Sequence, residues 1–132
     1  MNKSQLHIFF DMQISLSAIH KRYGEWVIVG KFCIIAVEDS LIEIWLCNTK
    51  DIAEGLGTRS IKNRLDALKS PSTTLVRELT GEGLVRTRCK QDVLTNLKLL
   101  GIRKARSVSE AQRQGFIDRM QPKSVHQEMV GA

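Results

Sequence analysis

The chain has 132 residues and lacks most of the features that mark membrane proteins and enzymes. Its apolar runs fall short of the roughly 18–20 residues that a membrane-spanning helix needs. The N-terminal MNKSQLHIFFDMQ carries too short an apolar run for a signal peptide. The signatures of serine hydrolases, zinc proteases and P-loop nucleotidases are all missing. We therefore expect a cytoplasmic protein that has no membrane partner and is not an enzyme.

Cysteines and aromatic residues are also scarce. The three cysteines, Cys33, Cys47 and Cys89, are widely separated, form no C-x-x-C pair, and lie far from most of the scattered histidines. This spacing favours buried free thiols over disulfides or a zinc site, so we expect no metal and no other cofactor. Aromatic residues make up only 5% of the chain, which argues against the stacking platforms used by single-stranded RNA binders.

Positive charge is present in excess and is unevenly distributed. The formal net charge is +6. Residues 1–47 hold four Lys/Arg and five Asp/Glu, whereas residues 48–90 hold nine and five. The basic excess therefore begins near residue 48 and continues to the C-terminus. Such an asymmetry indicates an anionic partner, most commonly nucleic acid, although net charge of this size also serves solubility.

The apolar pattern predicts an α+β fold. Residues 25–47 are rich in β-branched side chains, with a turn at 38–40, and predict a small N-terminal β-hairpin or meander. Residues 5–20 fit a strand and a helix equally well. C-terminal helices are expected from Gln91 to near Gly101 and from Ser107 to Pro122. We expect one DNA-binding domain over residues 1–121 and a flexible tail over 122–132.

The stretch 51–68, DIAEGLGTRSIKNRLDAL, predicts a helix-turn-helix-like pair of helices. Ile52, Ala53 and Leu56 form the apolar side of a short first helix, and Gly57 is the expected positive-φ residue of the turn. In the second helix Ile61, Leu65 and Leu68 form one apolar stripe, and Pro71 ends the helix. The opposite side carries Arg59, Lys62, Asn63 and Asp66.

A basic β-hairpin is expected after this pair of helices. Its two arms are Thr73–Leu79 and Leu84–Cys89, around the loop TGEG, so the hairpin resembles the wing of a winged helix. Cations on the second helix would contact bases or phosphates, and those on the wing would contact the DNA backbone. The candidate DNA-binding residues are Arg59, Ser60, Lys62, Asn63, Lys69, Arg77, Arg86 and Arg88.

Residues 41–57, LIEIWLCNTKDIAEGLG, resemble the start of the BRO N-terminal domain of phage antirepressors and baculovirus repeated-ORF proteins. Trp45 matches the aromatic residue that ends a strand in that family. Asp51, Ile52, Ala53, Leu56 and Gly57 match its D-[VI]-A-x-x-L-G signature. The chain departs from the family pattern at Thr58, where an aromatic residue is usual. The resemblance implies an α+β DNA-binding domain of phage or mobile-element regulation, and a winged helix-turn-helix domain is the close alternative.

The sequence thus predicts a transcriptional regulator that binds double-stranded DNA, with affinity from phosphate contacts and specificity from Arg59, Lys62 and Asn63. Palindromic sites require two-fold symmetry, so a homodimer is a possible partner state, with the N-terminal strands or the last helix as its interface. The alternative from another class is a protein-interaction module, an antirepressor that binds a repressor protein and does not touch DNA.

Overall fold

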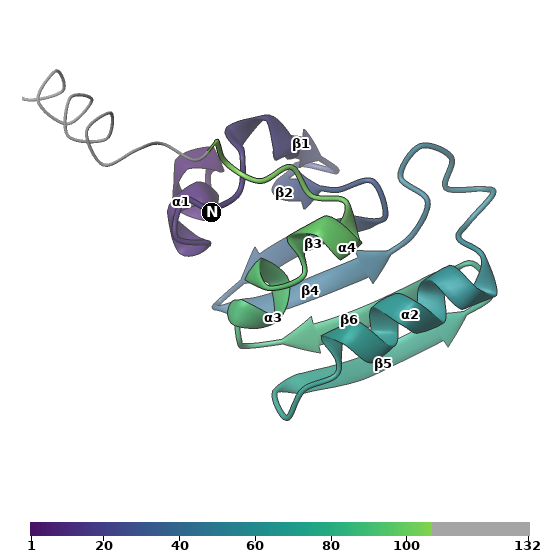
Figure 1. Ribbon diagram of the computed structural model, residues 1–132. Helices are drawn as coiled ribbons and strands as arrows, with labels where there is room; N and C mark the ends of the chain where they lie inside the picture. Colours follow the sequence, from purple (N-terminus) through teal and green to yellow (C-terminus); the bar gives the residue numbers. More distant parts are fainter. Residues whose placement is uncertain (107–132) are drawn as a thin grey trace, which may run out of the picture.

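The computed structural model describes residues 1–106. The expected helix that begins at Ser107 and the expected tail over 122–132 lie outside the described residues. The described part is an α+β structure built on one antiparallel six-stranded sheet with the order β1-β2-β3-β4-β6-β5 (Figure 1). Its strands are β1 (Ile19–Arg22), β2 (Glu25–Val29), β3 (Cys33–Glu38), β4 (Leu41–Leu46), β5 (Thr73–Leu79) and β6 (Glu82–Thr87).

The meander expected over residues 25–47 is confirmed as β2, β3 and β4, with the turn between β3 and β4 at residues 39–40. The alternation of buried and half-buried side chains shows how β4 lies in the sheet. Ile42, Ile44 and Leu46 are fully buried on one face, while Glu43 and Trp45 lie half-buried on the other. The ambiguous segment before the meander contains helix α1 (Lys3–Phe9), a 3₁₀ turn (Leu16–Ala18) and strand β1.

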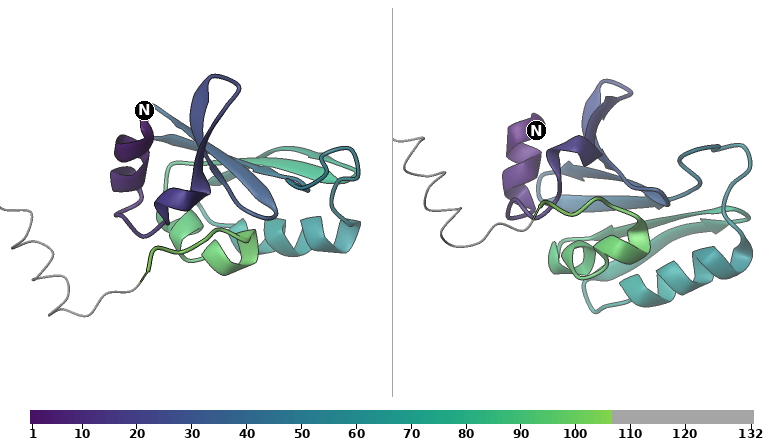
Figure 2. Two further views of the ribbon diagram at one scale, coloured as in Figure 1. Left: turned by 90° about the horizontal axis from the view of Figure 1, so that it is seen from above. Right: turned by 45° about the horizontal axis from the view of Figure 1, so that its top comes forward.

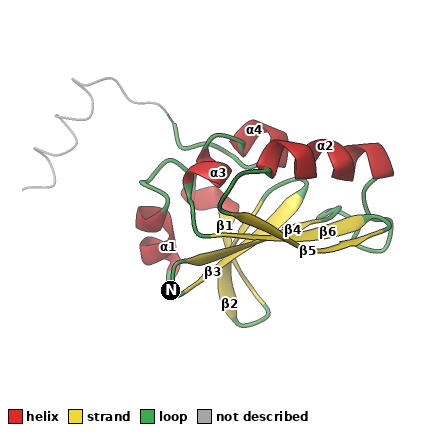
Figure 3. Cartoon of the chain, turned by 90° about the horizontal axis from the view of Figure 1, so that it is seen from below, coloured by secondary structure: helices red, strands yellow, loops and turns green. Residues whose placement is uncertain are grey.

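The helices α2 (Thr58–Leu68), α3 (Gln91–Leu94) and α4 (Leu97–Leu100) all lie on one side of the sheet (Figures 2 and 3). The core forms between them and the sheet. Ile61 and Leu68 of α2 pack with Leu97 and Leu100 of α4 and with Val85 of β6. Within residues 1–106 no helix is long and apolar enough to span a lipid bilayer.

The expected β5–β6 hairpin is present, but it is not a free wing. Strand β6 is hydrogen-bonded to β4 along its length, with Glu43 opposite Arg86 and Trp45 opposite Leu84. The hairpin therefore extends the sheet of the meander, and β5 forms its edge. Because β6 is an internal strand with Gly83, Val85 and Thr87 buried, its contacts hold the hairpin against the core.

Candidate nucleic-acid interface

The first helix of the expected helix-turn-helix pair is not formed. Residues 48–57 make a succession of turns between β4 and α2. The side-chain oxygen of Asn48 accepts hydrogen bonds from the backbone N–H groups of Lys50 and Asp51, and the Asp51 carboxylate accepts one from Ala53. These local bonds compete with helical ones, which is why Asn and Asp favour turns. The prediction of a helix pair was wrong in this segment.

The glycines of this loop also differ from expectation. Gly57 has φ −63° and is the N-cap of α2, whereas Gly55 has φ +71°. Gly55 lies against Gly81 of the β5–β6 turn, and the Leu56 N–H donates to the Gly81 carbonyl at 2.8 Å. The loop is therefore held across the tip of the hairpin by two glycines in backbone contact.

Helix α2 itself matches the expectation. It begins at Thr58 and ends at Leu68, before Pro71. Ile61 and Leu68 are buried and Leu65 is half-buried against the core, while the outward side carries exposed Arg59, Lys62, Asn63 and Asp66. The amphipathic stripe read from the sequence thus places three of the candidate DNA-binding residues together on the exposed surface of one helix.

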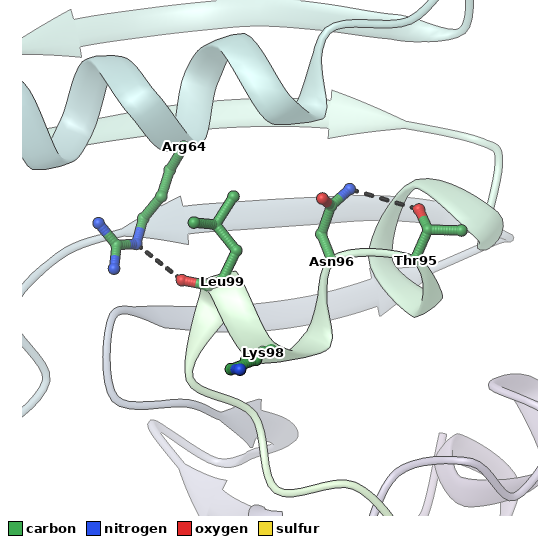
Figure 4. Close-up of a pocket in the computed structure, with 5 residues that line it drawn as sticks. All are labelled: Arg64, Thr95, Asn96, Lys98 and Leu99. Atoms are coloured by element: carbon green, nitrogen blue, oxygen red, sulfur yellow. Dashed lines mark hydrogen bonds between the residues drawn. The ribbon is translucent and has the colours of Figure 1, made fainter.

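Arg64 belongs neither to the apolar stripe of α2 nor to its exposed side. Its side chain extends from α2 to α4, where Nε donates to the Leu99 carbonyl at 2.9 Å (Figure 4). Its Nη1 donates to the Ser60 carbonyl and hydroxyl, and the guanidinium lies 3.8 Å from the centre of the Phe32 ring. Only 9% of Arg64 is exposed, and burial lowers its pKa from the ordinary value. Arg64 therefore joins α2, α4 and the β2–β3 turn as a structural residue.

The remaining candidates at the two ends of α2 have different surroundings. Ser60 is half-buried and its hydroxyl accepts from Arg64, so the oxygen already has a partner within the protein. Lys69 is the exposed C-cap residue of α2. Lys98 of α4 and Lys31 of the β2–β3 turn are exposed on the same side of the sheet, and the Lys31 N–H donates to the Gly101 carbonyl just after α4.

We call this surface the helical face, and the view in Figure 1 looks onto it. The sequence pattern did not identify Lys31 and Lys98 as part of it, because their position beside α2 depends on the packing of α4. The helical face comprises the exposed residues Lys31, Arg59, Lys62, Asn63, Asp66, Lys69 and Lys98.

A shallow hollow of about 430 Å³ lies between α2 and α4 on the helical face (Figure 4). The side chains that line it combine two cations, a hydroxyl, an amide and one apolar group. Asn96 Nδ2 donates to the Asp92 carbonyl at 2.8 Å, which fixes one wall. The donor groups of Arg64, Thr95 and Asn96 are already bonded within the protein, so the ammonium group of Lys98 is what the hollow offers to a ligand. Its lining residues are Arg64, Thr95, Asn96, Lys98 and Leu99.

The arginines of the hairpin lie on the other face of the sheet. Gly83 of β6 faces Ile61 and Leu65 of α2, and strand alternation turns Arg86 away from the helix. Arg77 pairs with Leu84 in the register of β5 and β6, so it shares the face of Arg86. Arg77, Arg86 and the helical face therefore do not form one continuous site. Arg88 is exposed just beyond β6.

Both hairpin arginines have acidic partners. Arg86 Nε lies 3.2 Å from Glu43 Oε1, and Arg77 Nη2 lies 3.6 Å from Glu82 Oε1. Glu82 also accepts a hydrogen bond from Trp45 Nε1 at 3.2 Å. Of the three ion pairs found within residues 1–106, the third joins Lys90 to Asp11, so none involves the helical face.

The cysteines are free thiols, as expected. Cys33 and Cys47 are buried and Cys89 is half-buried. Burial raises the pKa of Cys33 to about 12 and that of Cys47 to about 11, so both are protonated and unreactive at neutral pH. Within the described part of the chain, no three His, Cys, Asp or Glu side chains are grouped so that they could hold a metal ion.

One carboxylate has an unusual set of partners. Asp92 Oδ2 accepts from the hydroxyls of Ser70, Ser72, Thr73 and Thr87, at 2.6–3.2 Å. Burial opposes its ionisation, but the four hydroxyl hydrogen bonds outweigh burial and hold the Asp92 pKa below its ordinary value. This cluster ties the α2–β5 turn to the end of β6 and the start of α3, and its role is structural.

Comparison with known proteins adds no family. No family model matches the chain, and no curated protein and no solved structure is detectably similar to it. The residues that carry the BRO resemblance lie in β4 and in the turns that follow it, with Leu56 packed against the core. Membership of that family stays a prediction.

Proposed function

We propose that the chain binds double-stranded DNA through the helical face and acts as a transcriptional regulator of phage or mobile-element type. The observation that carries this proposal is the contrast between the two faces of the sheet. Five cations are exposed on the helical face, and within residues 1–106 none of them pairs with a carboxylate, whereas Arg77 and Arg86 on the opposite face each pair with a glutamate. Unpaired surface cations release counterions when they meet phosphates, which is the main source of DNA affinity.

The roles of the candidate residues follow from their positions. Lys31, Lys62, Lys69 and Lys98 would contact phosphates as point charges. Arg59 and Asn63 have the side-chain geometry for guanine and adenine edges, respectively. Arg77 and Arg86 leave the contact set, because they lie on the far face of the sheet, and Ser60 is occupied by Arg64. At the level of the family, the proposal includes membership of the BRO family.

The test is fluorescence anisotropy of a labelled random-sequence duplex, measured across a salt series. We compare the parent with Arg59→Ala/Lys62→Ala and with the matched control Lys21→Ala/Arg86→Ala, which removes the same charge from the other face, where Lys21 and the Arg86 partner Glu43 line one hollow. We expect a steep fall of affinity with salt. The slope should be shallower by about 1 for each lost phosphate contact in the helical-face variant and unchanged in the control. Equal losses in both variants, or no binding at low salt, would refute the proposal.

The alternative function is an antirepressor that docks on a repressor protein. One observation favours it: α2 lacks the preceding helix that crosses the DNA backbone in a helix-turn-helix. The helical face would then meet an acidic protein surface. Absence of DNA binding at low salt, together with loss of binding to a repressor in Arg59→Glu, would support this alternative over the first.

A further inference from the structure

Strand β5 is an exposed edge that the described chain leaves open. It is seven residues long, and six of them are exposed. Three of these are large apolar side chains, with Leu75 51%, Val76 41% and Leu79 50% exposed. An edge strand of this length presents a row of unpaired backbone N–H and C=O groups to any strand that can lie beside it.

The other edge of the sheet is built differently. Strand β1 has only four residues, and three of them are the exposed His20, Lys21 and Arg22. Short length and basic side chains are the usual means by which an edge strand avoids pairing. Strand β5 is longer, and its one basic residue, Arg77, pairs with Glu82 of the same chain; its one irregularity is a shift of register between Leu75 and Arg77. Of the two edges, β5 is the one suited to accept a partner.

We propose that β5 pairs with β5 of a second copy of this chain, antiparallel, about a two-fold axis perpendicular to the sheet between Val76 and Arg77. Such an axis keeps the helical face of both copies on one side. The pairing uses the edge of each copy once, so it closes as a dimer. This interface does not depend on the proposed DNA binding.

The register of the pairing follows from which face each side chain occupies. Leu75 and Glu78 lie on the side that α2 covers, and Thr74 and Leu79 lie on the other, as their partners in β6 show. Residues directly opposite one another in a sheet project from the same face. An axis between Val76 and Arg77 sets Leu75 opposite Glu78 and Thr74 opposite Leu79, so both faces match.

Charge disfavours two of the other registers. Axes that pass through Arg77 or through Glu78 would set two like charges opposite each other, which destabilises a strand pair. In the proposed register Arg77 is opposite Val76 and Glu78 is opposite Leu75. Glu78 of the second copy then lies on the helix side of the sheet, toward the end of α2 where Lys69 stands. Within residues 1–106 neither Glu78 nor Lys69 has an ion-pair partner, so each is available to the other across the axis.

Sedimentation velocity of the full chain without DNA tests the interface. We expect a species of about twice 14.9 kDa at roughly 100 µM protein. Val76→Lys should shift it to the monomer, because it places a charge at the centre of the strand pair. The matched control Ile8→Lys removes an apolar side chain that is 63% exposed on α1 and should leave the dimer intact. Circular dichroism establishes that both variants are folded.

Exchanging the charges of Glu78 and Lys69 tests the register. Glu78→Lys and Lys69→Glu should each weaken the dimer at least tenfold, and the double variant should recover most of that loss. A monomeric parent, a dimeric Val76→Lys or equal disruption by Ile8→Lys would overturn the interface, and failure of the double variant to recover would overturn the register. DNA binding that persists in a monomeric parent would leave the proposed function standing without the dimer.

Discussion

Replacing Gly55 by alanine tests whether residues 50–56 form the observed loop or the first helix of a helix-turn-helix. The substitution should lower the free energy of unfolding in the loop and raise it in the helix. In a helix over residues 50–56, alanine at this position would stabilise the protein by about 0.5–1 kcal/mol relative to glycine. In the observed loop Gly55 has φ +71°, and a side chain there would meet the backbone of Gly81. The two structures therefore predict changes of opposite direction.

The expected loss has two parts. A non-glycine residue in the left-handed region costs about 1–2 kcal/mol. A Cβ at Gly55 would lie 2.9 Å from the Gly81 Cα and 3.1 Å from its carbonyl oxygen, and these backbone atoms cannot rotate away as a side chain could. Opening the contact also weakens the hydrogen bond from Leu56 to Gly81. Together we expect Gly55→Ala to lower the free energy of unfolding by about 2–4 kcal/mol.

The assay is urea unfolding followed by tryptophan fluorescence of Trp26 and Trp45. With a slope of roughly 1.5 kcal/mol per M for a chain of this size, the midpoint should fall by about 1–3 M. Gly24→Ala is the matched control, since Gly24 has φ +80° but nothing lies within 4 Å of the place that an alanine Cβ would take. It should lose about 1–2 kcal/mol from backbone strain alone. A higher midpoint for Gly55→Ala than for the parent would refute the loop and restore the helix pair.

Three further outcomes follow from the contacts described above. Arg64→Met, which keeps an unbranched apolar stem but removes the guanidinium donors to α4, should lower the free energy of unfolding by about 2–4 kcal/mol in urea and leave DNA affinity of the folded protein unchanged. Folding lowers the Asp92 pKa, so the ionised carboxylate stabilises the protein fully above the unfolded carboxyl pKa of about 4. This stabilisation is lost as pH falls through the lower folded pKa. The difference in unfolding free energy between the parent and Asp92→Asn should therefore shrink in acid. In a thiol titration of the native protein at about pH 8, Cys89 should react first, and buried Cys33 and Cys47 only after unfolding.

The pattern of apolar residues was sufficient to predict the helices and strands in which buried residues recur at a regular spacing. The meander from Trp26 to Leu46 and the helix from Thr58 to Leu68 each bury a regular stripe, so their periodicity is visible in the sequence. The hairpin was predicted from its glycine-containing turn. The sequence did not predict that the hairpin and the meander form one sheet. The pairing of β6 with β4 links residues about forty positions apart, so it leaves no local signature.

The candidate site was predicted in part for the same reason. The helical periodicity correctly predicted that Arg59, Lys62 and Asn63 are exposed. It could not show that Arg77 and Arg86 face away from α2, since that depends on the register of β6 beside β4. Nor could the sequence distinguish a short helix from a loop at residues 50–56. The apolar spacing suits a helix, but the contact between Gly55 and Gly81 decides for the loop.

The proposed dimer constrains how DNA could be bound. Helix α2 lies over β6, so the two α2 helices would be separated by about three strand spacings, or about 14 Å. Helices that read successive major grooves must lie about 34 Å apart, which excludes paired major-groove reading by the two α2 helices in one dimer. A separation of about 14 Å is close to the roughly 12 Å width of a single major groove, so the two helices would meet the phosphates on either side of it. Binding would then be dominated by phosphate contacts, and we expect random and selected duplexes to differ in affinity by less than about tenfold at equal salt. A preference above about a thousandfold in the anisotropy assay would show that each α2 reads bases on its own, and that the strand-paired dimer is not the DNA-bound form.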